Sequence, residues 1–362
     1  MLYLWLYHLR DFFTGFNIFR YITFRCALAA LTAFLISLIF GPVVIRKLKK
    51  LKVLEKINKD DSIKLDSLSR HKQDTPTMGG ILILGAIIIS TLLWADISNK
   101  FVLIVLFVTI WLGITGFIDD YLKQVKEKAK GLSAASKFTS QIILGLILGT
   151  ILLELSANNI RLDLPFLKDV SISLDGLYVL FVILVVSGSS NAVNLTDGLD
   201  GLAAGIVVMV AVAFSVLCYV SGNKNFSEYL LIPYIRGSGE LSVFCSSILG
   251  AGLGFLWFNC YPASIFMGDV GSLALGGALG TVALLIKKEL LLVIVGGIFV
   301  LEALSVILQV GTFKFTKKRI FKIAPLHHHF QFLNWPENKV IVRFWIIASL
   351  LALLTMVTLK IR

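Results

Sequence analysis

Residues 191–201 read NAVNLTDGLDG, and they separate two apolar runs, LYVLFVILVVSGSS (177–190) and LAAGIVVMVAVAFSVLCYV (202–220). Neither flanking run contains a charged side chain. The second run is long enough to cross a membrane as a helix, which takes about 17–25 residues. The polar stretch therefore marks the junction of two predicted spans, and its amides and carboxylates indicate a site at the membrane surface.

The composition of the whole chain indicates the same class of protein. Of the 362 residues, 57% are hydrophobic and 15% are charged, whereas soluble domains carry about 25% charged residues. Basic loops at a membrane surface explain the net charge of +12 better than a nucleic-acid partner does. The four cysteines show no CxxC or Cys/His spacing, which argues against a zinc site and a disulfide framework.

Uncharged segments predict about ten transmembrane helices, at roughly 24–45, 76–95, 101–118, 136–154, 174–190, 199–220, 241–260, 268–286, 290–311 and 340–359. The predicted fold is an all-α, polytopic integral membrane protein with a single transmembrane catalytic domain over residues 1–362. Three long loops hold 21 Lys and Arg residues, and the loops on the other side hold seven. Because cytoplasmic loops are enriched in Lys and Arg, these three loops are predicted to be cytoplasmic and both termini to lie outside.

Polar motifs gather on the face that the lysines and arginines assign to the cytoplasm. They are TPTMGG (75–80), DD (119–120), NLTDGLDG (194–201), MGD (267–269) and PLHHHF (325–330). Asp119 and Asp120 end an uncharged run, where acids oppose the helix dipole, and Asp269 is an isolated acid near membrane depth. These positions predict a functional carboxylate cluster; the alternatives are a solvated helix end for the first two and a helix cap for Asp269.

Residues 191–201 contain amides and carboxylates at helical spacing. Asn191 and Asn194 are three residues apart, so they share a face if the stretch starts as a helix, and Asp197 and Asp200 follow them. The amides at the start of the next span would help to hold an anion. The alternative is a polar turn in which Thr196 or Asp197 caps the next helix.

Two further groups of polar side chains lie near the end of the chain. His327, His328 and His329 are consecutive in a predicted loop, which favours contact with phosphate or substrate over a zinc site or a solvated loop. Glu302 and Gln309 are seven residues apart on one face of the ninth predicted span. They form either a buried hydrogen-bonded pair or the wall of a substrate channel.

Several carboxylates without Cys or His ligand spacing predict a hard divalent cation, Mg²⁺ or Mn²⁺. The lysines, histidines and amides beside them predict binding of phosphate groups. The chain has no GxxxxGK[ST] sequence, so it is not a P-loop nucleotidase. A carboxylate-bound cation in a cationic cleft at the membrane surface is typical of phosphoryl transfer.

TPTMGG, GFIDDY, NAVNLTDGLDG, FMGDVGSL and APLHHHF together resemble the polyprenyl-phosphate N-acetylhexosamine-1-phosphate transferase superfamily, and within it the phospho-N-acetylmuramoyl-pentapeptide-transferases. The resemblance covers essentially the whole chain. It implies a Mg²⁺-dependent enzyme of the bacterial cytoplasmic (inner) membrane. Undecaprenyl phosphate would attack the sugar-linked phosphate of UDP-N-acetylmuramoyl-pentapeptide, which would give lipid I and UMP. A homodimer is left open.

The resemblance also implies roles for individual residues. Asp269 matches the metal ligand, and Asp119, with Asp120 beside it, matches the acid that deprotonates the lipid phosphate. The implied nucleoside pocket consists of Lys72, Asp200, Asn259 and Phe266, with Phe266 stacked on uracil. Asn194 and Asp197 match substrate contacts, and His327 and His328 match a phosphate- and sugar-facing loop. Thr77, Asn191, Gln309 and His329 complete the predicted substrate-binding set. Lys128 and Lys137 receive no role, because their loop is longer than expected.

Two rival functions remain. A sister transferase that uses UDP-N-acetylglucosamine shares the acidic motifs, although the PLHHHF motif favours the muramoyl-pentapeptide branch. A membrane transporter would place acids at the midplane, in broken helices and internal repeats. Here the acids cluster at one face and no repeat is visible, which favours an enzyme.

Overall fold

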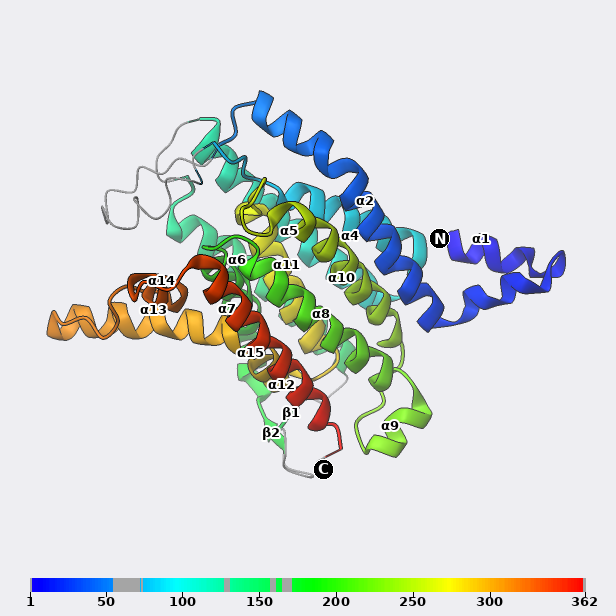
Figure 1. Cartoon of the computed structure of the whole chain (residues 1–362). Coiled ribbons are helices and arrows are strands. Elements are labelled where there is room, and N and C mark those ends of the chain that lie inside the picture. The colour runs from blue at the N-terminus through cyan, green and yellow to red at the C-terminus, as the bar shows by residue number, and fades with distance from the viewer. Residues whose placement is uncertain are drawn as a thin grey trace.

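The computed structural model describes residues 2–54, 72, 74–126, 131–156, 161–164 and 171–360. Within this part of the chain the only strands are β1 (Arg161–Asp163) and β2 (Ser171–Ser173), which pair as a short antiparallel hairpin. All other regular elements there are helices (Figure 1). The all-α fold class predicted from the apolar runs is confirmed.

Nine helices in the described residues are long and apolar enough to cross a membrane. They are α2 (Ile22–Lys50), α5 (Lys100–Gln124), α6 (Ala134–Ser156), α7 (Tyr178–Thr196), α8 (Leu202–Ser221), α10 (Gly239–Asn259), α11 (Gly268–Leu285), α13 (Gly297–Thr316) and α15 (Glu337–Val357). The shorter helical elements are α1 (Leu2–His8), η1 (Leu9–Asp11), η2 (Thr14–Arg20), α4 (Gly80–Trp94), η4 (Asp175–Leu177), α9 (Lys224–Leu230), α12 (Glu289–Val295) and α14 (Leu326–Phe332).

The span predicted over 76–95 is present as α4, which begins four residues later than predicted, at Gly80, and ends at Trp94. Helix α4 has 15 residues, so it is about 22 Å long, less than the hydrocarbon core of about 30 Å. Its expected first turn is replaced by backbone pairing with the segment before α11. The Phe266 N–H donates to the Pro76 carbonyl, and the Gly79 N–H donates to the Phe266 carbonyl, both at 2.8 Å. TPTMGG and FMGDVGSL are thereby joined.

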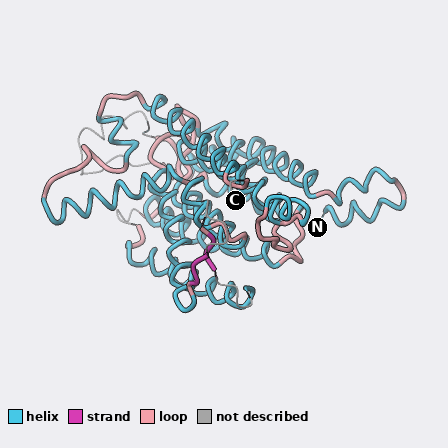
Figure 2. Tube along the Cα trace, turned by 90° about the horizontal axis from the view of Figure 1, so that it is seen from below, coloured by secondary structure: helices cyan, strands magenta, loops and turns pink. Residues whose placement is uncertain are grey.

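The predicted continuous span over 290–311 is wrong, because the chain breaks between α12 and α13. The break falls at Gly296, which is followed by Gly297, and glycine is a poor helix former. Beyond the break, α13 projects from the bundle in both views (Figures 1 and 2). Its outer face exposes apolar side chains, among them Leu304, Ile307 and Leu308.

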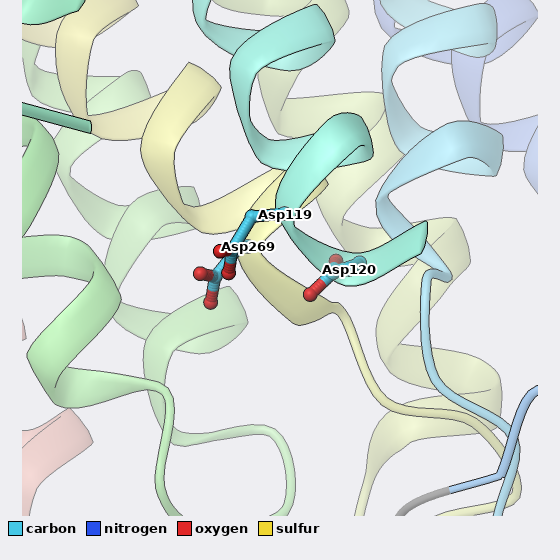
Figure 3. Close-up of side chains that lie close together, drawn as sticks. All are labelled: Asp119, Asp120 and Asp269. Carbon is cyan, nitrogen blue, oxygen red and sulfur yellow. The ribbon is translucent and has the colours of Figure 1, made fainter. Parts of the chain in front are cut away.

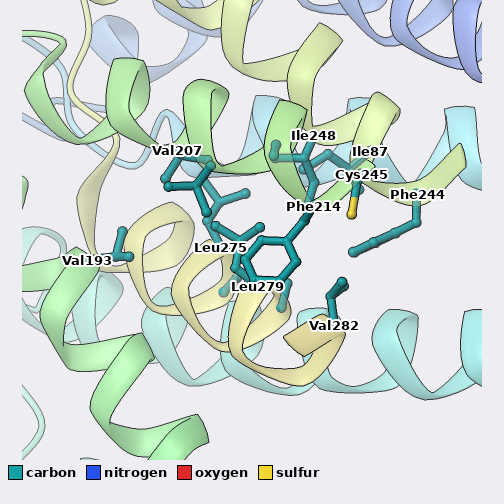
Figure 4. Close-up of a cluster of buried hydrophobic side chains, with 14 of the residues drawn as sticks. Ile87, Val193, Val207, Phe214, Phe244, Cys245, Ile248, Leu275, Leu279 and Val282 are labelled. Atoms are coloured by element: carbon teal, nitrogen blue, oxygen red, sulfur yellow. The ribbon is translucent and has the colours of Figure 1, made fainter. Parts of the chain in front are cut away.

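Helix α11 lies at the centre of the bundle, with 89% of its span buried. It packs against α5 on one side and α7 on another, while α10 packs against α2 and α8. Phe214 of α8 is fully buried and lies beside Leu275 and Leu279 of α11 (Figure 4). The high glycine content of α11 allows this close packing. Asp269 therefore lies in the first turn of the most buried of the nine spans.

At the far end of α4 from TPTMGG, a buried ion pair joins three helices. Arg25 of α2 donates to both carboxylate oxygens of Glu240 at 2.8 and 2.6 Å and to the Trp94 carbonyl at 3.1 Å. The Tyr3 ring covers the guanidinium, 4.3 Å from its centroid to the Arg25 Cζ. The aromatic N-terminal segment of α1, η1 and η2 then leaves the bundle, with Trp5 and Phe12 exposed (Figures 1 and 2).

Candidate active site

Three aspartates from two helices meet at one end of the bundle. Asp119 and Asp120 lie near the end of α5, and Asp269 lies in the first turn of α11 (Figure 3). One carboxylate oxygen from each lies within 4.8 Å of the others. Asp119 and Asp120 are buried, and 16% of the Asp269 side chain is exposed. The structure therefore brings together the acids that the sequence had placed on one face.

Close approach of the two helices makes this cluster. A Cβ atom placed on Gly116 of α5 would lie 2.2 Å from the carbonyl oxygen of Asp269, so only glycine fits there. The Asp120 carboxylate accepts a hydrogen bond from the Val270 N–H at 3.1 Å. Asp120, which belongs to α5, thus accepts one of the backbone N–H groups that have no partner within the first turn of α11. The Asp269 carboxylate is not needed for this bond and is available to face the site.

Two lysines hold the carboxylates of Asp119 and Asp269 together. Lys137 of α6 lies 2.7 Å from Asp119 Oδ2 and 2.6 Å from Asp269 Oδ2. Lys123 of α5 pairs with the same Asp119 oxygen and lies 3.1 Å from Asp269 Oδ2. Sequence reasoning gave neither lysine a role, although Lys123 stands four residues after Asp119, a spacing that favours an ion pair. Lys128 lies outside the described residues.

Asn194 completes the surroundings of Asp269. Its amide donates to Asp269 Oδ1 and to the Ser272 hydroxyl, both at 2.8 Å. The remaining Asp119 oxygen, Oδ1, accepts the Leu132 N–H at 2.7 Å. These bonds fix the orientation of both carboxylates. A cluster of three carboxylates with oxygen atoms this close fits the all-oxygen ligand set of a hard divalent cation.

A second cluster links Lys72 to two acids. The Lys72 ammonium lies 2.8 Å from Asp200 Oδ1 and 2.6 Å from Glu337 Oε1 at the start of α15. Although burial alone lowers the pKa of Lys72, the Glu337 and Asp200 carboxylates outweigh it and hold that pKa above its ordinary value. Glu337 also accepts the Asp200 N–H at 3.0 Å. Sequence reasoning missed Glu337, which lies 265 residues from Lys72 along the chain.

The predicted nucleoside-pocket residues gather around this cluster. The Lys72 ammonium lies 5.9 Å from the centroid of the Phe266 ring. Asp200 Oδ2 accepts the Ala263 N–H at 2.9 Å. The buried Asn259 amide donates to the Ile265 carbonyl at 2.7 Å. These four residues thus come from three segments. Lys72 pairs with Asp200 and lies near the Phe266 ring, and Asp200 and Asn259 bond to the backbone of residues 263 and 265.

The histidines lie in the short helix α14, which begins directly after Pro325, and not in the predicted loop. His327 is buried, 3.2 Å from the Glu302 carboxylate through its Nδ1. His328 Nδ1 lies 2.8 Å from Gln331 Oε1. His329 Nδ1 accepts the Lys322 N–H at 3.1 Å.

Other predicted substrate contacts bond elsewhere in the chain. The Asn191 amide donates to Gln141 Oε1 at 2.7 Å, between α7 and α6. Gln309 Oε1 accepts the backbone N–H groups of residues 320 and 321 at 3.2 and 3.0 Å. Glu302 and Gln309 therefore bond to different segments. Thr77 is buried beside Gly268, and Asp197 is the C-cap residue that follows α7.

Known proteins match both the motifs and the length of this chain. The sequence profile of Glycosyl transferase family 4 matches residues 102–287, and the Phospho-N-acetylmuramoyl-pentapeptide-transferase signature 1 matches residues 72–84. Three relatives named phospho-N-acetylmuramoyl-pentapeptide-transferase align over 364 positions, covering 100% of this chain and 100% of each relative. The Desulfatibacillum aliphaticivorans protein is 55% identical, and those of Citrifermentans bemidjiense and Geobacter sp. strain M21 are 52% identical. The chain belongs to the phospho-N-acetylmuramoyl-pentapeptide-transferase family.

Proposed function

We propose that this enzyme transfers phospho-N-acetylmuramoyl-pentapeptide from UDP-N-acetylmuramoyl-pentapeptide to undecaprenyl phosphate, giving lipid I and UMP. The observation that carries the proposal is the cluster of Asp119, Asp120 and Asp269 with two bridging lysines. Carboxylates beside ammonium groups suit a reaction in which charge on phosphoryl oxygens must be positioned and neutralised. The full-length relatives carry the name of this activity.

We assign the chemistry of the phosphate groups to the three-aspartate cluster. Asp119, Asp120 and Asp269 would hold Mg²⁺, with Asp269 as the principal ligand, and the bound cation would supply neutralisation of the charge on the diphosphate. Asp119 would take the proton from the lipid phosphate. An oxygen of the lipid phosphate would then form a bond to the sugar-linked phosphorus, while the bond from that phosphorus to UMP breaks and UMP leaves. Lys123 and Lys137 pair with the carboxylate oxygens of Asp119 and Asp269. In the complex, their ammonium groups bind the diphosphate as point charges.

The nucleoside part of the substrate is assigned to the cluster around Lys72. Phe266 supplies an aromatic face for the uracil, next to the Lys72 ammonium. The buried Asn259 Oδ1 has no hydrogen-bond partner among the described residues. Buried acceptors in folded proteins are nearly always hydrogen-bonded, so a donor from the substrate is expected here. A base that offers an N–H group would satisfy it.

The enzyme is a multi-pass protein of the bacterial cytoplasmic membrane, as its apolar helices and its family indicate. We further propose that residues 1–362 act as one transmembrane catalytic domain. The proposed active site opens to the cytoplasm, where a water-soluble nucleotide sugar is available, and both termini lie outside. The excess of Lys and Arg in the loops on the active-site side supports this orientation.

The test is release of UMP by the purified enzyme in detergent or lipid. UDP-N-acetylmuramoyl-pentapeptide should give UMP only when undecaprenyl phosphate and Mg²⁺ are both present, and a chelator should stop the reaction. UDP-N-acetylglucosamine, offered in the same assay, should give none. UMP release from that sugar alone would assign the chain to the sister activity instead.

A further inference from the structure

Glu302 is a fully buried carboxylate in α13, and its two oxygens approach two groups of a single residue. Oε1 accepts the backbone N–H of His327 at 3.1 Å, and Oε2 lies 3.2 Å from the His327 Nδ1. Glu302 is 0% exposed and the His327 side chain is 1% exposed. A buried carboxylate requires a compensating partner, and among the described residues the imidazole is the ionisable group that provides one.

The Oε2–Nδ1 contact has the distance of an ion pair but not the alignment of a hydrogen bond. Such contacts in an enzyme without its substrate often tighten only in the complex. A carboxylate at Nδ1 favours the imidazole form that carries its hydrogen on that nitrogen. Nε2 is then the nitrogen left for another molecule, as in metal and triad sites where a carboxylate orients a histidine.

His327 Nε2 points to the polar stretch 191–201, at Gly198. A Cβ atom placed on Gly198 would lie 2.3 Å from Nε2, so the ring edge rests directly on the backbone there. Nε2 has no hydrogen-bond partner among the described residues, although the residue is buried. An unpaired, buried acceptor nitrogen beside the predicted substrate-binding segment 191–201 indicates that a donor group of the substrate completes it.

We propose that Glu302 is a positioning residue for the transfer reaction: it holds the ring of His327 with its hydrogen on Nδ1, so that Nε2 accepts a hydrogen bond from a hydroxyl or amide N–H of the nucleotide sugar. The inference rests on the proposed function. It also explains why α13 and α14, which both lie at the edge of the bundle, are connected by a buried carboxylate. A purely structural link would need only the backbone bond to Oε1.

Glu302→Gln separates the two contacts. A glutamine side chain has one acceptor oxygen, so it can keep the backbone bond and the fold but cannot also hold Nδ1–H. We expect kcat/KM for UMP release to fall about 10- to 100-fold, the usual effect of losing an orienting partner. Glu302→Ala should lower it at least as much. The matched control is Glu240→Gln, which removes a buried, ion-paired carboxylate at the far end of α4; it should lower Tm and leave kcat/KM unchanged.

A double-mutant cycle decides between positioning and packing. If Glu302 acts through His327, adding Glu302→Gln to His327→Ala should cause no further loss of kcat/KM, because the two residues form one unit. Losses that multiply would overturn the inference, as would a Glu302→Gln enzyme with wild-type kcat/KM or a fully active His327→Ala enzyme. In each of these cases the wild type still releases UMP, so the proposed function stands; a wild type that releases none refutes the function itself.

Discussion

Asp269 contacts two lysines and one asparagine, and an amide can replace its carboxylate with almost no change in volume. Asp269→Asn therefore tests charge alone. We expect Mg²⁺-dependent UMP release to fall more than about 100-fold, since the loss of a metal ligand should exceed the 10- to 100-fold effect of an outer-sphere change. Asp175→Asn, at an exposed acid in η4, is the control. Turnover within a few-fold of wild type across a Mg²⁺ titration would refute the metal-ligand assignment.

Lys137 bridges the two aspartates of the cluster and has a second role in the proposed chemistry. Lys137→Gln leaves those carboxylates with one fewer cation, so half-maximal activity should be reached at a lower Mg²⁺ concentration. The same change should lower kcat/KM about tenfold or more, because a hydrogen bond to a charged group contributes about 1.5–3 kcal/mol. Lys126→Gln removes an exposed charge nearby and should change neither the Mg²⁺ concentration for half-maximal activity nor kcat/KM. An unchanged Mg²⁺ requirement would show that lysine and metal do not compete.

Phe266 offers an aromatic face next to Lys72. Phe266→Ala should raise KM for the nucleotide sugar about tenfold with a smaller effect on kcat, because base–aromatic stacking contributes about 1–3 kcal/mol and is made in ground and transition states alike. Steady-state kinetics at saturating undecaprenyl phosphate separate the two constants. A collapse of kcat at unchanged KM would place Phe266 in the chemistry instead.

Among whole elements, the approach of α5 to α11 is what assembles the carboxylates. Gly116→Ala forces the two helices apart, because its Cβ would lie 2.2 Å from the Asp269 carbonyl oxygen. We expect a loss of about 1–3 kcal/mol of stability and a larger proportional loss of UMP release. Gly188→Ala in α7 meets open space and should leave both nearly unchanged. Thermal unfolding and turnover measured on the two variants make the comparison, and a fully active Gly116→Ala enzyme would argue against this packing.

The apolar runs predicted where helices form but not how they end. Helix α5 continues to Gln124, beyond the predicted end at 118, because Asp119 and Asp120 are buried and bonded instead of solvated. The Gly296–Gly297 pair favours a break, but the uncharged run around it is long enough for one straight span, and the length of that run decided the prediction. The start of α4 depends on pairing with a segment almost 190 residues later, which local patterns cannot reveal.

The candidate site shows the same division. Motif residues such as Asp119, Asp269 and Asn194 were predicted because acids and amides are rare in apolar surroundings. Lys137 and Glu337 were missed because they stand in ordinary charged loops or at a helix start, and only the fold brings them to a carboxylate or a lysine. Long-range partners of this kind require the tertiary structure.

For the whole molecule, the orientation in the membrane decides whether the carboxylate cluster faces the compartment that contains UDP-sugars. A cysteine placed at Lys318, after α13, should react with a membrane-impermeant thiol reagent only in inverted vesicles. A cysteine at Asn225, in α9, should react only in intact cells. Both side chains are exposed, and the background lacks Cys26, Cys218, Cys245 and Cys260. The opposite pattern would place the carboxylate cluster outside, away from any UDP-sugar.

The projection of α13 from the bundle affects which surfaces of the enzyme other membrane proteins can contact. Because α13 projects from the bundle and exposes several leucines and Ile307, we expect it to keep other proteins from packing closely against this flank. In a membrane, we expect lipid to contact the exposed apolar side chains of α13 next to the bundle. The flank next to α14 would then stay in contact with the membrane, which would leave a lateral route for a substrate dissolved in it.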